Sequence, residues 1–197
     1  DARQLLLRDA AQRHYAENLR VSTLAMEYQT CGRKHTAEVL ANHGVGFSRG
    51  GLISALRQQG FLDSELSASG LQSRRGDDVI PSGSYVYPHR NVQGQVCHFT
   101  FKNPDIRGAW QPVNTSRLAG IMFFGEHTLL RGGAVALVEG ENDFLSLIEA
   151  GWPGPVLASI GQISKSQLAW LRTAIIDRTV VTFFDHDDAG GKYRAKV

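Results

Sequence analysis

The chain has 197 residues, of which 42% are hydrophobic, with 21 Lys and Arg against 19 Asp and Glu. These values favour one ordinary domain or two small ones with a packed core, and they exclude a chain that is disordered throughout. No apolar run approaches the roughly 18 residues that a membrane-spanning helix needs. Leu5-Leu6-Leu7 is followed at once by Arg8 and Asp9, which is not typical of a signal peptide.

Charge and cysteine content narrow the class of protein further. Residues 1–134 carry 15 Lys and Arg against 11 Asp and Glu, whereas residues 135–197 carry 6 against 8. A basic part before an acidic part suits a metal site beside a bound polyanion, although ordinary scatter of charges gives the same pattern. The two cysteines, Cys31 and Cys97, form no C-x-x-C pair, so no zinc module is expected in this chain, and reduced thiols in a cytoplasmic protein are favoured.

The first part of the chain is predicted to form short helices and then a β-hairpin. An amphipathic helix is expected at residues 2–19, because Leu5, Leu6, Ala10 and His14 recur at helical spacing. Further short helices are expected at 22–29, 36–41, 51–59 and 63–68. The pattern then changes to period two. It predicts strands at 85–87 and 96–101, joined by a turn at 91–94, and another strand at 121–124.

The second part of the chain alternates strands with helices. Strands are predicted at 134–138, 156–159 and 179–184, and helices through 144–148 and over 164–174, with Ser164 as the N-cap of the latter. The continuous apolar runs are typical of strands buried on both faces. This order predicts a parallel sheet with right-handed crossovers and a domain boundary between residues 133 and 134.

Acidic residues follow two of these predicted strands directly. Glu139 comes after the first, and Asp185 and Asp187 come after the third. In open α/β sheets, sites form beyond the carboxyl ends of the strands, and carboxylate oxygens are the ligands that Mg²⁺ prefers. A single Glu-Gly is more often a turn, and a single Asp-x-Asp is more often a solvated turn or a helix cap. Their combination within one alternating unit predicts a metal-dependent site.

This combination resembles the Toprim domain. Glu139 in V-E-G-E-N-D matches the family's acid/base glutamate, and Asp143 matches the aspartate that follows it by four in primases. Asp185 and Asp187 in F-D-H-D-D-A-G match the metal-binding pair, and A-S-I-G at 158–161 matches the segment between the two motifs. The resemblance covers residues 134–197. It is closest to bacterial DnaG-like primases, in particular to phage or mobile-element forms. Tyr87-Pro88 and the following Gly-Gln-Val at 94–96 look like the subdomain that precedes Toprim in primases.

The resemblance implies a fold class and an activity. The fold would be an α+β amino-terminal subdomain (1–133) followed by the first part of an α/β, Rossmann-like Toprim domain (134–197), truncated at its carboxyl end. The activity would be DNA-templated synthesis of RNA primers by metal-dependent nucleotidyl transfer. Glu139 would be catalytic, and Asp185, Asp187 and Asp143 would hold Mg²⁺ or Mn²⁺. The expected partners are single-stranded DNA template, nucleoside triphosphates and a replicative helicase, which could lie on the same full-length chain.

Basic residues are candidates for contacts to DNA or nucleotide. They are Arg90, Lys102, Arg107 and Lys192. A solvated surface is the more common role for any one of the first three, and a solvated helix face suits Lys192 equally well. Aromatic residues in the hairpin could stack on bases, but core packing is more common in strands. Two other functions stay open at this point. One is a Toprim nuclease or part of a topoisomerase, and the other is a non-catalytic module that holds single-stranded DNA or recruits a helicase.

Overall fold

The computed structural model describes residues 2–106, 110–112 and 121–184, and it divides into two compact units. The first unit comprises Asp1–His89 and Gln95–Gly120, and the second comprises Arg90–Gly94 and Ile121–Val197. The domain boundary that the sequence predicts between residues 133 and 134 stays a prediction, because compactness alone does not define a domain. No helix in the described ranges is both long and apolar enough to cross a membrane.

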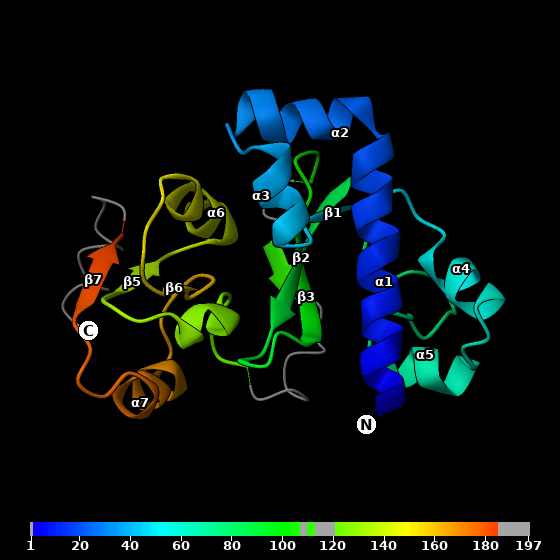
Figure 1. The fold of residues 1–197 in the computed structure, drawn as a ribbon. Coiled ribbons are helices and arrows are strands. Elements are labelled where there is room, and N and C mark those ends of the chain that lie inside the picture. The colour runs from blue at the N-terminus through cyan, green and yellow to red at the C-terminus, as the bar shows by residue number, and fades with distance from the viewer. Residues whose placement is uncertain (1, 107–109, 113–120, 185–197) are drawn as a thin grey trace. The chain divides into compact units, whose positions relative to one another are not determined.

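One long helix and several short ones dominate the first unit (Figure 1). They are α1 (Ala2–Val21), α2 (Thr23–Glu27), a π-helical turn (Tyr28–Gly32), α3 (Ala37–Asn42), α4 (Leu52–Gln58) and α5 (Asp63–Ser69). Their ends follow local chemistry. Thr36 accepts a hydrogen bond from the Val39 N–H at 3.2 Å, and Glu65 accepts one from the Leu62 N–H at 2.8 Å. Every helix that the sequence predicts in this part is confirmed to within a few residues.

A four-stranded sheet completes the first unit. Its strands are β1 (Gly46–Ser48), β2 (Ser84–Arg90), β3 (Val96–Lys102) and β4 (Trp110–Pro112), and they lie in the order β1-β2-β3-β4. β2 and β3 confirm the predicted hairpin, whose turn is closed by the Gly94 N–H donating to the Asn91 carbonyl at 2.8 Å. The sequence did not predict β1 and β4, because three residues are too few to show a period-two pattern.

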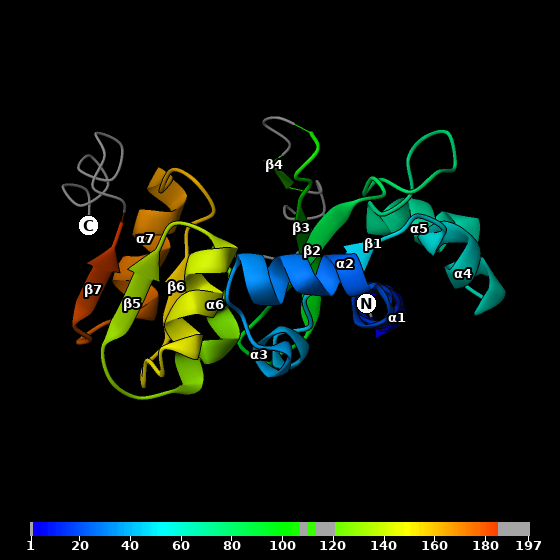
Figure 2. The same ribbon diagram turned by 90° about the horizontal axis from the view of Figure 1, so that it is seen from above.

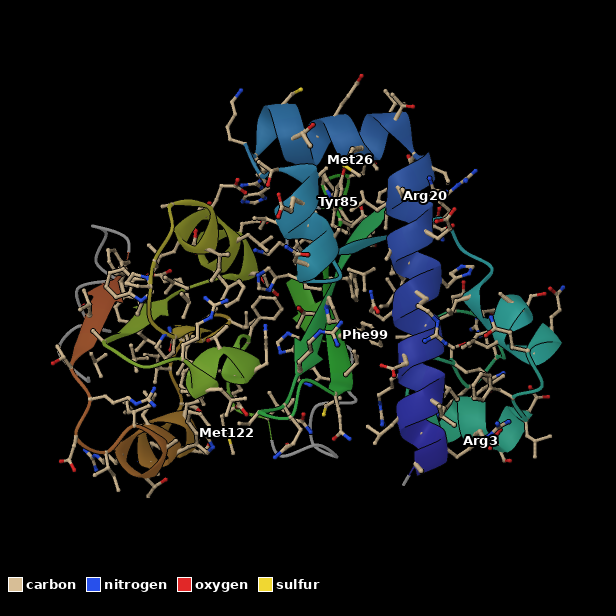
Figure 3. All side chains as sticks on the ribbon, in the orientation of Figure 1. Arg3, Arg20, Met26, Tyr85, Phe99 and Met122 are labelled. Atoms are coloured by element: carbon tan, nitrogen blue, oxygen red, sulfur yellow. The ribbon has the colours of Figure 1, made fainter. Side chains whose placement is uncertain are left out.

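The hairpin aromatics belong to the core of this unit. Tyr85, Tyr87 and Phe99 are 5%, 1% and 1% exposed. The ring of Phe99 packs edge-on against Tyr15 of α1 at 5.8 Å between centroids, and Figure 3 shows Phe99 between its strand and that helix. The Tyr85 hydroxyl donates to the Ala25 carbonyl at 3.3 Å, and burial raises the pKa of Tyr85 to about 12. Core packing is therefore the role that the structure supports for these rings, since bases have no access to buried faces.

The second unit contains a three-stranded parallel sheet. β5 (Val135–Val138) lies in the middle, between β6 (Val156–Ala158) and β7 (Val180–Phe183). The helices α6 (Glu141–Glu149) and α7 (Lys165–Ala174) lie on opposite faces of this sheet (Figure 2). That is the arrangement that right-handed crossovers require when the chain passes first to one neighbour of β5 and then to the other. Leu171 of α7 and Ile175, which follows the helix, join Val135 and Leu137 of β5 in one apolar cluster.

Two predictions about the second unit need correction. Residues 121–124 form no strand; Phe124 alone makes an antiparallel bridge to Ala158, before Gly125 (φ 98°) turns the chain into a 3₁₀ helix at Glu126–Leu130. The strand predicted at 179–184 is not buried on both faces. β7 lies at an edge of the sheet within the described residues, where Phe183 is 43% exposed, whereas all four residues of β5 are buried.

Candidate active site

The ends of the parallel strands define the candidate site. Val138 is the register partner of both Ala158 in β6 and Phe183 in β7. The residues that follow, Glu139, Ser159 and Phe184, therefore leave the sheet at the same edge. Asp185 is the next residue in the sequence and lies outside the described ranges, as do Asp187, Lys192 and Arg107.

Neighbouring backbone groups hold the backbone of Glu139 in place. The residue is half-buried, directly after the last residue of β5 and before Gly140, which caps α6. Its carbonyl accepts hydrogen bonds from the N–H groups of Ile160 at 2.9 Å and Gly161 at 3.4 Å. Because the residue is fixed on one side by a buried strand and on the other by a helix start, its backbone has little freedom to move.

The first turn of α6 contributes Asp143 and Glu141. Asp143 is exposed, and its Oδ2 accepts the Gly140 N–H at 2.9 Å, so its carboxylate is turned back toward the Glu139–Gly140 peptide. Glu141 is fully buried. Both carboxylates lie where the unpaired N–H groups of a helix concentrate partial positive charge, which favours anionic side chains.

The loop after β6, residues 159–161, lies next to Glu139. Ile160 has a φ of 56° and Gly161 one of 87°. A left-handed conformation is costly for a β-branched residue, on the order of 1–3 kcal/mol, so surrounding bonds must hold it. The Ser159 hydroxyl donates to the Gly161 carbonyl at 2.9 Å, and the Ser159 N–H donates to the Val138 carbonyl at 3.1 Å.

The donor chemistry here fits a hard divalent cation. Glu139 and Asp143 supply carboxylate oxygens from adjoining elements, and oxygen is what Mg²⁺ and Mn²⁺ bind. Among the residues that the structure describes, no group of three or more His, Cys, Asp and Glu could hold a metal ion. The metal-binding roles of Asp143, Asp185 and Asp187 stay predictions.

The basic residues lie on the hairpin of the first sheet. Arg90 ends β2, and its Nη1 donates to the Gly94 carbonyl at 2.8 Å across the turn. Lys102 ends β3, with Nζ 5.9 Å from the centroid of the Tyr87 ring. Arg90 is the last residue before the turn and Lys102 is the last residue of β3, so the turn and the whole of β3 lie between them in the sequence. Their contacts to nucleic acid stay predictions.

The sequence analysis missed two buried polar side chains near the site. Glu126 is 4% exposed, and its Oε1 accepts the N–H groups of Met122 at 2.6 Å and Phe123 at 3.0 Å. Burial raises the pKa of the Glu126 carboxyl, although these two donors counteract the rise. Gln167 is 9% exposed and bonds to three separate backbone groups. The pattern Ser-x-x-Gln at 164–167 is a capping signal and could have marked Gln167, whereas Glu126 has no local signal.

Comparison with known proteins relates this geometry to a family. Residues 136–197 match the family model described as Toprim-like, and no curated protein sequence matches the chain. The fold is that of the RNA polymerase domain of Mycobacterium tuberculosis primase DnaG, with a TM-score of 0.83 and 27% identity over 100% of this chain and 70% of that chain. The same domain in complex with a double-stranded DNA oligomer with a 6-nucleotide overhang gives 0.81 and 29%, over 96% of this chain and 66% of that chain.

A more distant structure has the same fold. The Aquifex aeolicus primase, comprising zinc-binding and RNA polymerase domains, gives a TM-score of 0.79 at 22% identity, over 98% of this chain and half (50%) of that chain. These likenesses confirm the predicted fold class, a helical amino-terminal part followed by a Toprim-like α/β part, which is that of bacterial DnaG catalytic cores. A phage or mobile-element origin stays a prediction.

The pKa of Glu126 generates a testable pH dependence. A carboxyl whose pKa is raised on folding contributes stability that is complete below its unfolded pKa, taken as 4.5, and that is lost as pH rises through the folded pKa. Glu126→Gln removes this loss, because a neutral amide does not ionise. We expect urea unfolding to show the variant gaining stability relative to the wild type as pH rises from below 4.5 to neutrality. Glu27→Gln, at an exposed position, is the control, and parallel pH curves for wild type and Glu126→Gln would contradict the prediction.

Proposed function

We propose that this chain is the catalytic core of a DNA primase, which synthesises RNA primers on a DNA template by metal-dependent nucleotidyl transfer. The observation that carries the proposal is the register of the parallel sheet, in which Val138 pairs with Phe183. Because of this register, Glu139 lies at the same edge of the sheet from which the sequence continues toward Asp185 and Asp187. The likeness of the fold to DnaG RNA polymerase domains supports the proposal.

The acidic residues would have two separate roles, proton transfer and metal binding. Glu139, half-buried at the end of a buried strand, would accept or donate the proton that moves when the primer hydroxyl attacks a nucleoside triphosphate. Asp185 and Asp187, with Asp143, would hold Mg²⁺ or Mn²⁺. When bound, such ions neutralise the charge that develops on the phosphates. The amino-terminal end of α6 adds a positive partial charge beside Glu139, which favours an anionic ligand at this edge.

Single-stranded template would bind through the basic residues of the hairpin. Residues 1–134 carry the excess of Lys and Arg, and the mycobacterial domain has been solved with DNA. We include Arg90, Lys102 and Arg107 in this contact, and Lys192 in nucleotide binding. A replicative helicase as partner and a cytoplasmic location are part of the same proposal, since both accompany primer synthesis during replication.

The central test replaces Glu139 with Gln in the full-length protein. The substitution keeps the shape of the side chain and removes the group that titrates, so the fold should survive. Templated primer synthesis should fall by roughly 10²-fold or more, in line with the loss of general acid–base catalysis. The assay supplies single-stranded DNA, labelled nucleoside triphosphates and Mn²⁺, and Glu27→Gln is the matched control at an exposed site.

The products of this assay separate the candidate functions. Labelled polymer supports a primase, cleaved DNA without incorporation identifies a nuclease, and binding without either reaction identifies a non-catalytic module. Primer synthesis by Glu139→Gln at near wild-type rate contradicts the role assigned to this carboxylate.

The template contact predicts a dependence on salt. Each phosphate that a cation neutralises releases counterions, so the logarithm of the affinity for single-stranded DNA should fall linearly with the logarithm of salt concentration. Arg90→Gln, Lys102→Gln and Arg107→Gln should each weaken binding and reduce the slope by about 0.7. Fluorescence anisotropy over a salt series measures both quantities.

Arg172→Gln is the control for this series, since it removes one positive charge from an exposed position of α7 that we do not place on the template. It should leave the slope unchanged. Slopes that stay at the wild-type value in the Arg90, Lys102 and Arg107 variants would remove these residues from the template contact.

A further inference from the structure

Gln167 joins three segments of the second unit. The residue lies in the first turn of α7 and is 9% exposed. Its Nε2 donates to the Met122 carbonyl at 2.7 Å and to the Ser159 carbonyl at 3.0 Å, and its Oε1 accepts the Ser164 N–H at 2.9 Å. One side chain therefore ties the start of α7 to the loop after β6 and to the segment before the 3₁₀ helix, where Figure 3 marks Met122.

The bond from Gln167 to the Ser159 carbonyl also connects Gln167 to the backbone of Glu139. Ser159, whose carbonyl Gln167 holds, donates its own N–H to the Val138 carbonyl at 3.1 Å. The N–H of the following peptide, that of Ile160, donates to the Glu139 carbonyl at 2.9 Å. Because the Ser159 carbonyl and the Ile160 N–H belong to one rigid peptide plane, fixing the carbonyl also fixes the donor that holds Glu139.

The local conformation needs such a restraint. Ile160 has a left-handed φ of 56°, which a β-branched residue adopts only when its surroundings impose it. Gln167 bonds to the Ser159 carbonyl, in the peptide that precedes Ile160, and the Ser159 hydroxyl bonds to the Gly161 carbonyl, one peptide beyond the one that follows Ile160. Loss of the Gln167 bond would leave one flank of the strained residue without its side-chain restraint.

Helix capping alone does not account for Gln167. The Ser164–Gln167 capping box uses only Oε1 and the Ser164 N–H. The two donated bonds run to chain segments 8 and 45 residues away, and they use both N–H groups of the amide. A primary amide is the side-chain group of this size that offers two donors and one acceptor together.

We propose that Gln167 is a positioning residue for Glu139, acting through the Ser159–Gly161 loop. The inference rests on the proposed function insofar as Glu139 is catalytic, but the mechanical link between Gln167 and the Glu139 carbonyl is independent of it. The two parts are therefore tested by different measurements.

Amide hydrogen exchange tests the link. Gln167→Glu keeps an oxygen for the Ser164 N–H and replaces the two donors with an anionic oxygen facing two carbonyls. We expect the amides of Ile160 and Gly161 to exchange about tenfold faster or more, since two hydrogen bonds are lost and the new carboxylate repels the two carbonyl oxygens. The Ala136 amide, bonded to the Pro155 carbonyl at 2.8 Å inside the sheet, should keep its protection.

Two further variants complete the exchange experiment. Gln58→Glu makes the same substitution at an exposed position of α4 and should leave all these amides unchanged. Gln167→Met, which removes the donors without adding a charge, replaces Gln167→Glu if that variant does not fold. Wild-type protection at Ile160 and Gly161, or an equal loss of protection at Ala136, overturns the proposal, because the first shows no link and the second shows a general loosening.

Kinetics of the full-length protein test the consequence. In Gln167→Glu the kcat for primer synthesis should fall by about 10- to 100-fold with little change in KM for nucleotide. This is the effect expected when a positioning residue is lost and the catalytic residue is misplaced. The effect should be much smaller in a Glu139→Gln background, because both substitutions act on one unit. Equal effects in both backgrounds overturn positioning through Glu139. Full activity of Glu139→Gln alone instead refutes the catalytic role proposed for Glu139, absence of primer synthesis by the wild type refutes the proposed function, and in both cases the exchange result still decides the link.

Discussion

Parallel pairing of β5 with both of its neighbours is the constraint on which the candidate site depends. β5 is buried along its whole length, so it cannot slip in register without moving its side chains to the wrong face. Its pairing sets Val138 level with Ala158 and Phe183. The segments that follow β5 and β6 bend within two residues of the strand end. The packing of the sheet, rather than a flexible loop, therefore places Glu139.

Electrostatics supports the proposal that a cation binds at this edge. Glu139, Glu141 and Asp143 lie within five residues, and Asp185 and Asp187 follow the neighbouring strand in sequence. The α6 amino terminus offsets part of this negative charge, and the Gly140 N–H bond to Asp143 uses one of the unpaired donors of that terminus. In the proposed reaction a nucleoside triphosphate would add further negative charge, which divalent cations between the phosphates and the carboxylates would neutralise.

The sequence predicted those parts of the fold whose signal is local. The hairpin of β2 and β3 and the alternation of β5, β6 and β7 with helices show their own periodicity, and Glu139 stands out because it follows an apolar run. The helix α1 was also predicted, but its expected apolar face was partly wrong: Leu6 is 56% exposed, and Leu7, Ala11 and Tyr15 are buried instead. The segment at 121–124 shows where such local prediction fails. Phe123 and Phe124 are apolar like the residues of a buried strand and are each 1% exposed, but only Phe124 pairs with the sheet, by a single bridge to Ala158. The bonds of Gln167 join residues 45 positions apart, and no local pattern encodes such contacts. The edge position of β7 depends on strand order, which the sequence does not reveal.

Paramagnetic broadening by Mn²⁺ tests the central claim most directly, because it locates the metal without requiring activity. In an NMR titration of the full-length protein, the amides of Glu139, Gly140 and Ile160 should lose intensity at the lowest Mn²⁺ concentrations. Amides in the middle of α1 should keep their intensity, and Asp185→Asn should abolish the selective loss. The account is contradicted if broadening is uniform over both units, or if it centres on residues away from the carboxyl ends of β5 and β6.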